Sequence, residues 1–362
     1  MDGDDALTIT EDGSISTTGN SENGVESTGA GNIITNNGTI STSGGSASGI
    51  YGLGASTVIT NNGTILAAGE GILNLGDNAL IINNGTIDAE FDGISNDGDR
   101  AVITNNGVML ETGIFNTGNY AVITNNGTID TSYDGIFNDD GADAIITNNG
   151  TIQADDVGIY NRDGSLAHII NYGTIQASDD GIFNQNSDDA IILNDGTIQA
   201  SDDGIFNQNS DDAIILNDGI IQAADDGIYN NSSNDVIIVN SGTVRADGDG
   251  IYNRSSDDVI ITNNGTIQTA GDGIYIFNSD RAVITNSGSI RTDGSGENAI
   301  FARNSVSATI NNTGLLVSEV HTAIRVGAGS SGTAVNLGAP SYIGGGIFFG
   351  SSATLNITTG AS

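Results

Sequence analysis

Short segments in which apolar and polar residues alternate recur along almost the whole chain. The clearest reads I-x-N-x-G-T-I, and its glycine recurs at a constant spacing between Gly127 and Gly288, whereas the spacing varies before Gly127. Each period holds three short segments rich in Ile, Phe and Thr and separated by Asn, Asp and Gly. Such segments predict β-strands, because they are too short for helices and carry no helical apolar period. The repeat glycines stand at positions 13, 38, 63, 85, 107, 127, 150, 173, 196, 219, 242, 265, 288 and 314.

Three strands in each period predict one triangular coil of a parallel β-helix, with each strand paired to its equivalents in the neighbouring coils. The expected fold is therefore all-β, a β-solenoid of about fourteen coils, mostly of 22–23 residues with three short strands each. The block Gly173–Asp195 is repeated without change as Gly196–Asp218, which is typical of a stack of equivalent coils.

The columns of the repeat predict which side chains face the interior. Around Gly196 these are Ile192, Asn194 and Ile198, and Ile stands at the position equivalent to Ile192 in every unit. Alternation along a strand places these three positions on one side of the chain. We expect the asparagines to form a ladder of amides along the axis, and the glycine to free the φ angle of the bend.

Composition and charge narrow the partners and the chemistry. The formal net charge is −37, and all eight basic residues are Arg, so nucleic acid and anionic lipid are not expected as partners. The absence of Cys excludes disulfides, thiolate metal sites and a Cys nucleophile, and no window is apolar enough for a membrane-spanning helix. Met1 leads directly into Asp2-Gly3-Asp4-Asp5, which is unlike a signal peptide, so we expect either a cytosolic protein or one whose signal peptide has been removed.

An acidic column precedes the second glycine of each coil and includes Asp180, Asp203, Asp226 and Asp249. Like charges at the spacing of adjacent strands repel each other. Two interpretations stay open: these residues occupy ordinary solvated turns, or their carboxylates bind Ca²⁺ between coils.

An aromatic column follows the same glycine and includes Phe183, Phe206, Tyr229 and Tyr252. One interpretation is that the stacked rings cover one another and stiffen the sheet. The other is that the exposed stripe contacts a ligand, either a sugar or a partner protein.

The repeat bears on three further functions. A polysaccharide-degrading β-helix would use carboxylates such as Asp180 and Asp203 as acid and base. Uniform coils are unlike an active centre, and His168 and His321 stand at unrelated coil positions, so we expect no enzyme. A calcium-stiffened structural matrix protein is a further alternative. The outward Thr column could suit ice binding, but bulky Gln and Arg neighbours disfavour it.

The units ITNNGTI, as at 59–65, resemble the β-helical passenger domains of bacterial autotransporters (type V secretion). The tail GGGIFFGSSATLNITTGAS looks like the stretch that joins such passengers to their outer-membrane barrel. The resemblance implies a right-handed helix, a removed signal peptide, a barrel downstream, and export across the outer membrane to the cell surface. The corresponding domains are an N-terminal coil at 1–30, regular repeats at 31–315, and irregular C-terminal coils at 316–362 that lead towards the barrel.

The function that follows from this resemblance is that of a non-catalytic adhesin or rigid display stalk, acting through many weak repeated contacts. The expected partner is a glycan or protein of a host or neighbouring cell surface, with self-association as another option. We expect this segment to make no membrane contact of its own and to need no cofactor, unless Ca²⁺ binds the acidic column.

Overall fold

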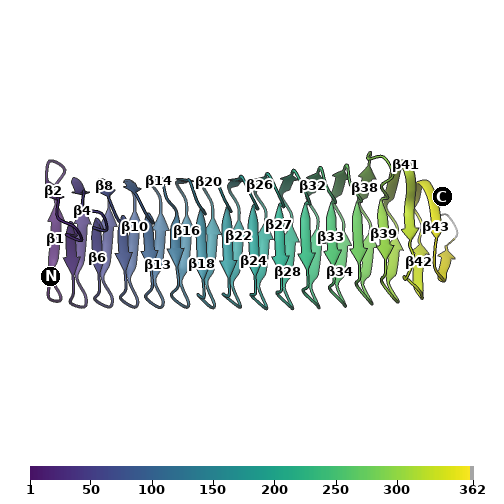
Figure 1. Ribbon diagram of the computed structural model, residues 1–362, viewed down its shortest axis with the longest axis horizontal. Helices are drawn as coiled ribbons and strands as arrows, with labels where there is room; N and C mark the ends of the chain where they lie inside the picture. The colour runs from purple at the N-terminus through teal and green to yellow at the C-terminus, as the bar shows by residue number, and fades with distance from the viewer. Residues whose placement is uncertain (359–362) are drawn as a thin grey trace. The chain divides into compact units, whose positions relative to one another are not determined.

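The computed structural model describes residues 1–358 and contains 44 β-strands and no helix in that range (Figure 1). The fold is an all-β parallel β-solenoid, as the repeat predicts. The chain divides into two compact units, unit 1 (Met1–Ser178) and unit 2 (Asp179–Ser362), each described here by itself. No helix in the described part is long and apolar enough to cross a membrane.

Unit 1 consists of coils with three faces. Face 1 comprises β1 (Ala6–Ile9), β4 (Ile33–Asn36), β7 (Val58–Asn61), β10 (Leu80–Asn83), β13 (Val102–Asn105), β16 (Val122–Asn125), β19 (Ile145–Asn148) and β22 (His168–Asn171). Face 2 comprises β2 (Ser14–Thr17), β5 (Thr39–Thr42), β8 (Thr64–Ala67), β11 (Thr86–Ala89), β14 (Val108–Glu111), β17 (Thr128–Thr131), β20 (Thr151–Ala154) and β23 (Thr174–Ala177). Face 3 comprises β3 (Val25–Ser27), β6 (Ile50–Gly52), β9 (Ile72–Asn74), β12 (Ile94–Asn96), β15 (Ile114–Asn116), β18 (Ile136–Asp139) and β21 (Ile159–Arg162).

Unit 2 repeats this arrangement. Face 1 comprises β25 (Ile191–Asn194), β28 (Ile214–Asn217), β31 (Ile237–Asn240), β34 (Ile260–Asn263), β37 (Val283–Asn286), β40 (Thr309–Asn312), β42 (Thr333–Leu337) and β44 (Ala353–Ile357). Face 2 comprises β26 (Thr197–Ala200), β29 (Ile220–Ala223), β32 (Thr243–Ala246), β35 (Thr266–Thr269) and β38 (Ser289–Thr292). Face 3 comprises β24 (Ile182–Gln185), β27 (Ile205–Gln208), β30 (Ile228–Asn231), β33 (Ile251–Arg254), β36 (Ile274–Phe277) and β39 (Ile300–Arg303).

The last coils have longer strands. β41 (Leu315–Val326) pairs in parallel with both β38 and β39, so one strand covers faces 2 and 3, and β43 (Tyr342–Phe349) pairs with β41 through two register irregularities. The predicted boundaries at 30 and 315 and the predicted right-handedness stay predictions. The end of the predicted C-terminal segment, residues 359–362, lies outside the described residues.

Parallel pairing in register aligns the columns of the repeat. In unit 2, Ile214 pairs with Ile237 and Asn217 with Asn240, so each residue meets its own equivalent in the next coil. The inward Ile column is confirmed, because Ile192, Ile215 and their equivalents are buried. The Asn ladder is confirmed too: Asn194 Nδ2 donates to Asn217 Oδ1 at 2.8 Å, and Asn217 donates to the next Asn at 2.7 Å. These amides satisfy one another where no water reaches them.

A second buried Asn ladder runs along face 3. Asn184 Nδ2 donates to Asn207 Oδ1 at 2.8 Å, and Asn207 donates to Asn230 at 2.8 Å. Unit 1 has the same ladder from Asn74 to Asn96 and onward at 2.7 Å. This ladder was not predicted, although an Asn after Ile-Phe or Ile-Tyr recurs in most coils.

The role predicted for the repeat glycine is wrong. Gly219 does not have a positive φ; a Cβ there would lie 2.1 Å from the carbonyl oxygen of Gly196 in the preceding coil. Close approach of the backbone, and not conformational freedom, requires glycine at this position. The left-handed conformation occurs instead at acidic turn residues such as Asp212 and Asp235, with φ of 57° and 56°. Asp tolerates this region better than most residues.

Candidate functional site

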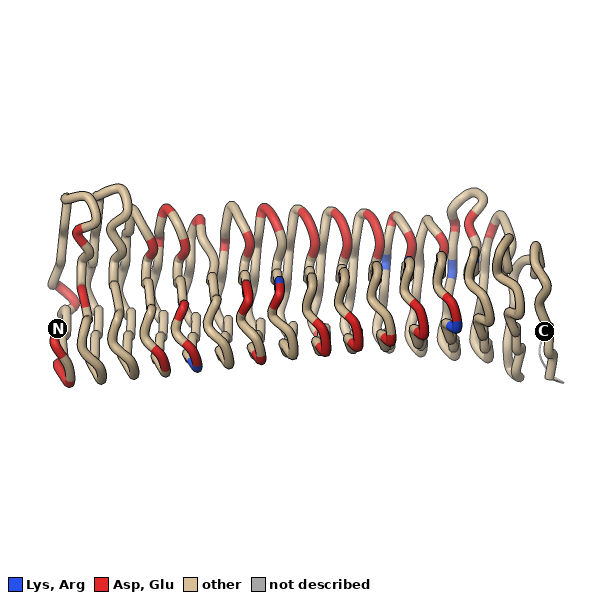
Figure 2. Tube along the Cα trace, turned by 60° about the horizontal axis from the view of Figure 1, so that its bottom comes forward, with Lys and Arg blue, Asp and Glu red and all other residues tan. Residues whose placement is uncertain are grey.

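The acidic column lies at the corner between faces 2 and 3, and Figure 2 shows acidic residues recurring at the same level of successive coils of unit 2. Asp180, Asp203, Asp226 and Asp272 are buried, with 4–7% of their surface exposed, and Asp249 is half-buried. The interpretation as solvated turns is therefore wrong for this column. Their burial was not apparent from the turn-like sequence.

Backbone amides hold the carboxylates in a ladder. The amide of Asp203 donates to Asp180 Oδ1 at 3.0 Å, that of Asp226 to Asp203 Oδ1 at 2.9 Å, and that of Asp249 to Asp226 Oδ1 at 2.6 Å. The ladder continues from Asp272 to Asp249 at 2.6 Å. Asn298 holds the next position of this column after Asp272. An Asn side chain therefore fits where the carboxylates lie.

Burial makes ionisation of this column costly. Burial, together with the charges of Asp226 and Asp180, raises the pKa of Asp203 to about 9. Burial raises the pKa of Asp226 to about 7, and burial with neighbouring charges raises that of Asp249 to about 8. At neutral pH part of the column is therefore protonated, so it is not a row of free carboxylates.

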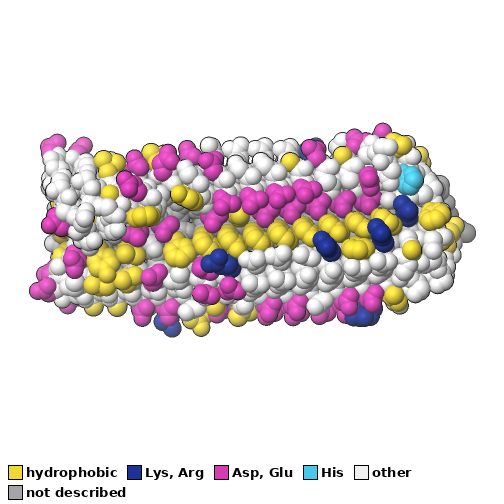
Figure 3. Space-filling view, viewed as in Figure 1, with side chains coloured by type: hydrophobic (Ala, Val, Ile, Leu, Met, Phe, Trp, Pro, Cys, Tyr) yellow, Lys and Arg dark blue, Asp and Glu magenta, His cyan; other side chains and the backbone are white. Residues whose placement is uncertain are grey.

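The aromatic column is a ladder of stacked rings. Phe183 and Phe206 are 4.7 Å apart with an interplanar angle of 2°, and Tyr229 and Tyr252 are 4.9 Å apart at 5°. Their faces cover one another, as one interpretation predicts, so the column presents mainly ring edges to solvent. Figure 3 shows this apolar stripe beside a row of acidic side chains. The ligand-contact interpretation of these four residues stays a prediction.

Oxygen ligands for a cation come together at this corner in two groups. One is Asp179, Asp180 and Asp202, and the other is Asp202, Asp203 and Asp225; within each group the ligand atoms lie within 4.8 Å of one another. Neither Asp226 nor Asp249 belongs to such a group, so the four predicted metal residues are brought into one column but not into one site. Carboxylate groups of this kind suit hard cations such as Ca²⁺.

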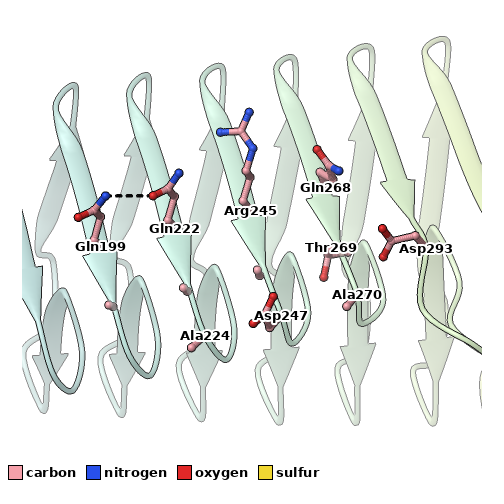
Figure 4. A pocket seen from close by; sticks show the side chains of 12 residues that line it. Gln199, Gln222, Ala224, Arg245, Asp247, Gln268, Thr269, Ala270 and Asp293 are labelled. Carbon is pink, nitrogen blue, oxygen red and sulfur yellow. Dashed lines mark hydrogen bonds between the residues drawn. The ribbon is translucent and has the colours of Figure 1, made fainter.

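A shallow groove of about 420 Å³ lies on face 2 of unit 2 (Figure 4). Its outer side chains come from successive strands: Gln199, Gln222, Arg245 and Gln268 project from β26, β29, β32 and β35 above small alanine side chains. Gln199 Nε2 donates to Gln222 Oε1 at 3.1 Å, whereas Arg245 forms no ion pair with any residue from 1 to 358. This groove was not predicted, because alternation along a strand does not reveal a groove.

The comparisons with known proteins give one likeness. Residues 151–314 match the family model described as periplasmic copper-binding protein (NosD), which is less than half of the chain. No curated protein and no solved structure gives a significant match.

The residues of this chain do not fit a copper site. Copper favours imidazole, thiolate and thioether ligands. The matched segment contains one such residue, His168, and neither Cys nor Met. The acidic groups found within residues 1–358 contain no His.

Proposed function

We propose that this chain is an exported, non-catalytic β-solenoid that acts as an adhesin or rigid display stalk at a bacterial cell surface. Two likenesses support an extracytoplasmic place: the family model that matches residues 151–314 is described as periplasmic, and the ITNNGTI units resemble autotransporter passengers. Catalysis needs groups with individual environments. Here the same backbone-to-carboxylate hydrogen bond recurs from coil to coil and no His stands beside the candidate acids within residues 1–358, which supports a scaffold.

The groove on face 2 of unit 2 is the observation that carries the proposal. Gln199 and Gln222 are hydrogen-bonded to each other here, but Arg245 has no acidic partner and Gln268 forms no side-chain hydrogen bond within the described residues. Donors and acceptors above an alanine floor fit the hydroxyl groups of an extended glycan that follows the coil axis. Because the amide recurs from strand to strand, weak contacts add up along the chain.

The test is binding of the full chain to a panel of immobilised surface polysaccharides. Gln222→Ala together with Gln268→Ala should weaken binding at least tenfold. The control Asn264→Ala removes an exposed amide outside the groove and should change nothing. If the double variant binds a glycan as tightly as the control variant does, or if the parent protein binds no glycan, the groove is not the contact surface.

A reducing-sugar assay on the same panel separates binding from degradation. An adhesin should release no reducing ends. Release that disappears in Asp203→Asn would establish the rival function, a polysaccharide-degrading β-helix with carboxylates such as Asp180 and Asp203 as acid and base.

A second candidate function, a calcium-stiffened stalk or matrix protein, rests on the two carboxylate groups around Asp202. Ca²⁺ bound there would offset the repulsion between coils and raise the melting temperature relative to EDTA. Asp202→Asn should abolish that rise. Equal melting temperatures in Ca²⁺ and EDTA would exclude this function.

A further inference from the structure

One coil of unit 1 is shorter than its neighbours. In the Asn ladder of face 1, the side chain of Asn105 bonds to that of Asn125, which is 20 residues later in the sequence. Asn125 in turn bonds to Asn148, which is 23 residues later. Two of the missing residues come from the corner between faces 2 and 3, where only Thr112 and Gly113 connect β14 to β15. The same corner is longer in the coils before and after, where it comprises 90–93 and 132–135. The short corner leaves a notch of about 340 Å³ between the two longer ones.

Aromatic side chains form the walls of this notch. Phe91 and Tyr133, from the flanking corners, are 53% and 65% exposed. Phe115 and Phe137 lie deeper, with centroids 5.4 Å apart and planes tilted by 56°. They therefore do not cover each other as the stacked rings of unit 2 do. On its other side Phe115 pairs with Ser95, so the aromatic column does not continue into that coil.

The polar groups of the notch are acidic. Glu90, Asp92 and Asp134 line it, and no Arg or His does among the described residues. Burial, with the charges of Glu70 and Asp97, raises the pKa of Asp92 to about 6, so its carboxylate is ionised above neutral pH.

A buried hydroxyl marks the floor. Thr112 is 2% exposed, and its Oγ1 has no hydrogen-bond partner within residues 1–358. A buried polar atom without a partner is destabilising unless something pairs with it. A ligand with a hydroxyl or N–H group at this depth would supply that partner.

We propose that the notch binds a small organic cation whose alkylated ammonium group lies among Phe91, Phe115 and Tyr133. Aromatic faces attract such cations through their quadrupole, and an alkylated nitrogen is more easily desolvated than a bare ammonium. The carboxylates of Glu90, Asp92 and Asp134 compensate its charge, and Thr112 binds a polar group of the same ligand. The notch shares no residue with the groove of unit 2, so this inference stands independently of the proposed function.

The test uses choline as the probe and the full chain, titrated by calorimetry at pH 8. Choline has a quaternary ammonium and one hydroxyl; 3,3-dimethyl-1-butanol has the same shape without the charge. We expect saturable binding of choline and at least tenfold weaker binding of the neutral isostere. Equal affinities, or no heat from choline at millimolar concentration, would overturn the proposal.

Exposed side chains allow variants that keep the fold. Tyr133→Leu should weaken choline binding at least tenfold, because it keeps an apolar side chain and removes the ring face. Tyr172→Leu replaces a tyrosine that is 51% exposed in unit 1 and does not line the notch, so it is the matched control. Equal losses in both variants would show that choline binds elsewhere.

Discussion

Replacing Asp272 by asparagine isolates the energetic effect of one buried carboxylate. Asp272 is 4% exposed, its Oδ1 accepts from the amide and side-chain nitrogen of Asn298 at 2.5 and 2.9 Å, and its own amide donates to Asp249 Oδ1. An asparagine keeps the shape and the acceptor oxygen. Asn298 occupies the equivalent place one coil later, so the column accommodates an amide there.

The magnitude follows from the pKa. Burial raises the pKa of Asp272 from 3.8 to about 6, and the hydrogen bonds from Asn298 oppose this only in part. An acid whose pKa is raised on folding adds stability below its unfolded pKa of 3.8 and loses it as the pH rises through about 6. At about 1.36 kcal/mol for each unit of pKa, this loss amounts to about 3 kcal/mol between pH 3.5 and pH 8.

Asp272→Asn should therefore unfold like the parent near pH 3.5 and be more stable by up to about 3 kcal/mol at pH 8. Urea unfolding followed by circular dichroism in EDTA at both pH values measures the difference. Asp293→Asn removes the same charge from an exposed turn of unit 2 and is the control. Equal stability changes in the two variants at pH 8, or a variant less stable than the parent there, would refute the account of the buried column.

Three other predictions concern the scaffold and its donors. Asn207→Ala leaves the amide of Asn184 and the oxygen of Asn230 without their ladder partner. It should therefore lower the free energy of unfolding, measured in urea, by about 2–4 kcal/mol. A loss no larger than that caused by the exposed substitution Asn62→Ala would contradict the ladder's role. Gly219→Ala places a Cβ 2.1 Å from a carbonyl oxygen and should lower the free energy of unfolding by on the order of 4 kcal/mol or more. Gly45→Ala, where no atom lies within 4 Å of the added Cβ, should be tolerated. Comparable melting temperatures of the two variants would argue against close approach as the reason for glycine. Copper added to EDTA-treated protein should be removed by dialysis, as checked by elemental analysis, and retention of one equivalent would show that the donor argument is mistaken.

The repeat period determined most of what could be predicted. The constant spacing and the columns of Ile and Asn identify the strands, the parallel register and the interior, because every coil repeats the same constraint. Gly219 shows where this reasoning stops: its column is obvious, but the reason for glycine lies in the distance to the preceding coil.

The candidate sites were less predictable because they depend on how corners fold. The sequence around Asp203 is typical of a turn, and only the structure shows that its side chain is buried. The notch around Thr112 had a visible signal, the short spacing between Gly107 and Gly127. Which side of the triangle lost the residues, and that four aromatic rings would line the gap, follows only from the structure.

The unchanged repetition of Gly173–Asp195 as Gly196–Asp218 has a consequence for inheritance. An in-frame loss or gain of one such segment joins residues that already stand in equivalent columns, so the amide ladders and the Ile interior remain in register. Such a change would therefore add or remove one coil, which corresponds to one strand spacing of about 4.8 Å, without introducing a packing defect. The number of coils in this chain can therefore change without altering the contacts that each remaining coil makes with its neighbours.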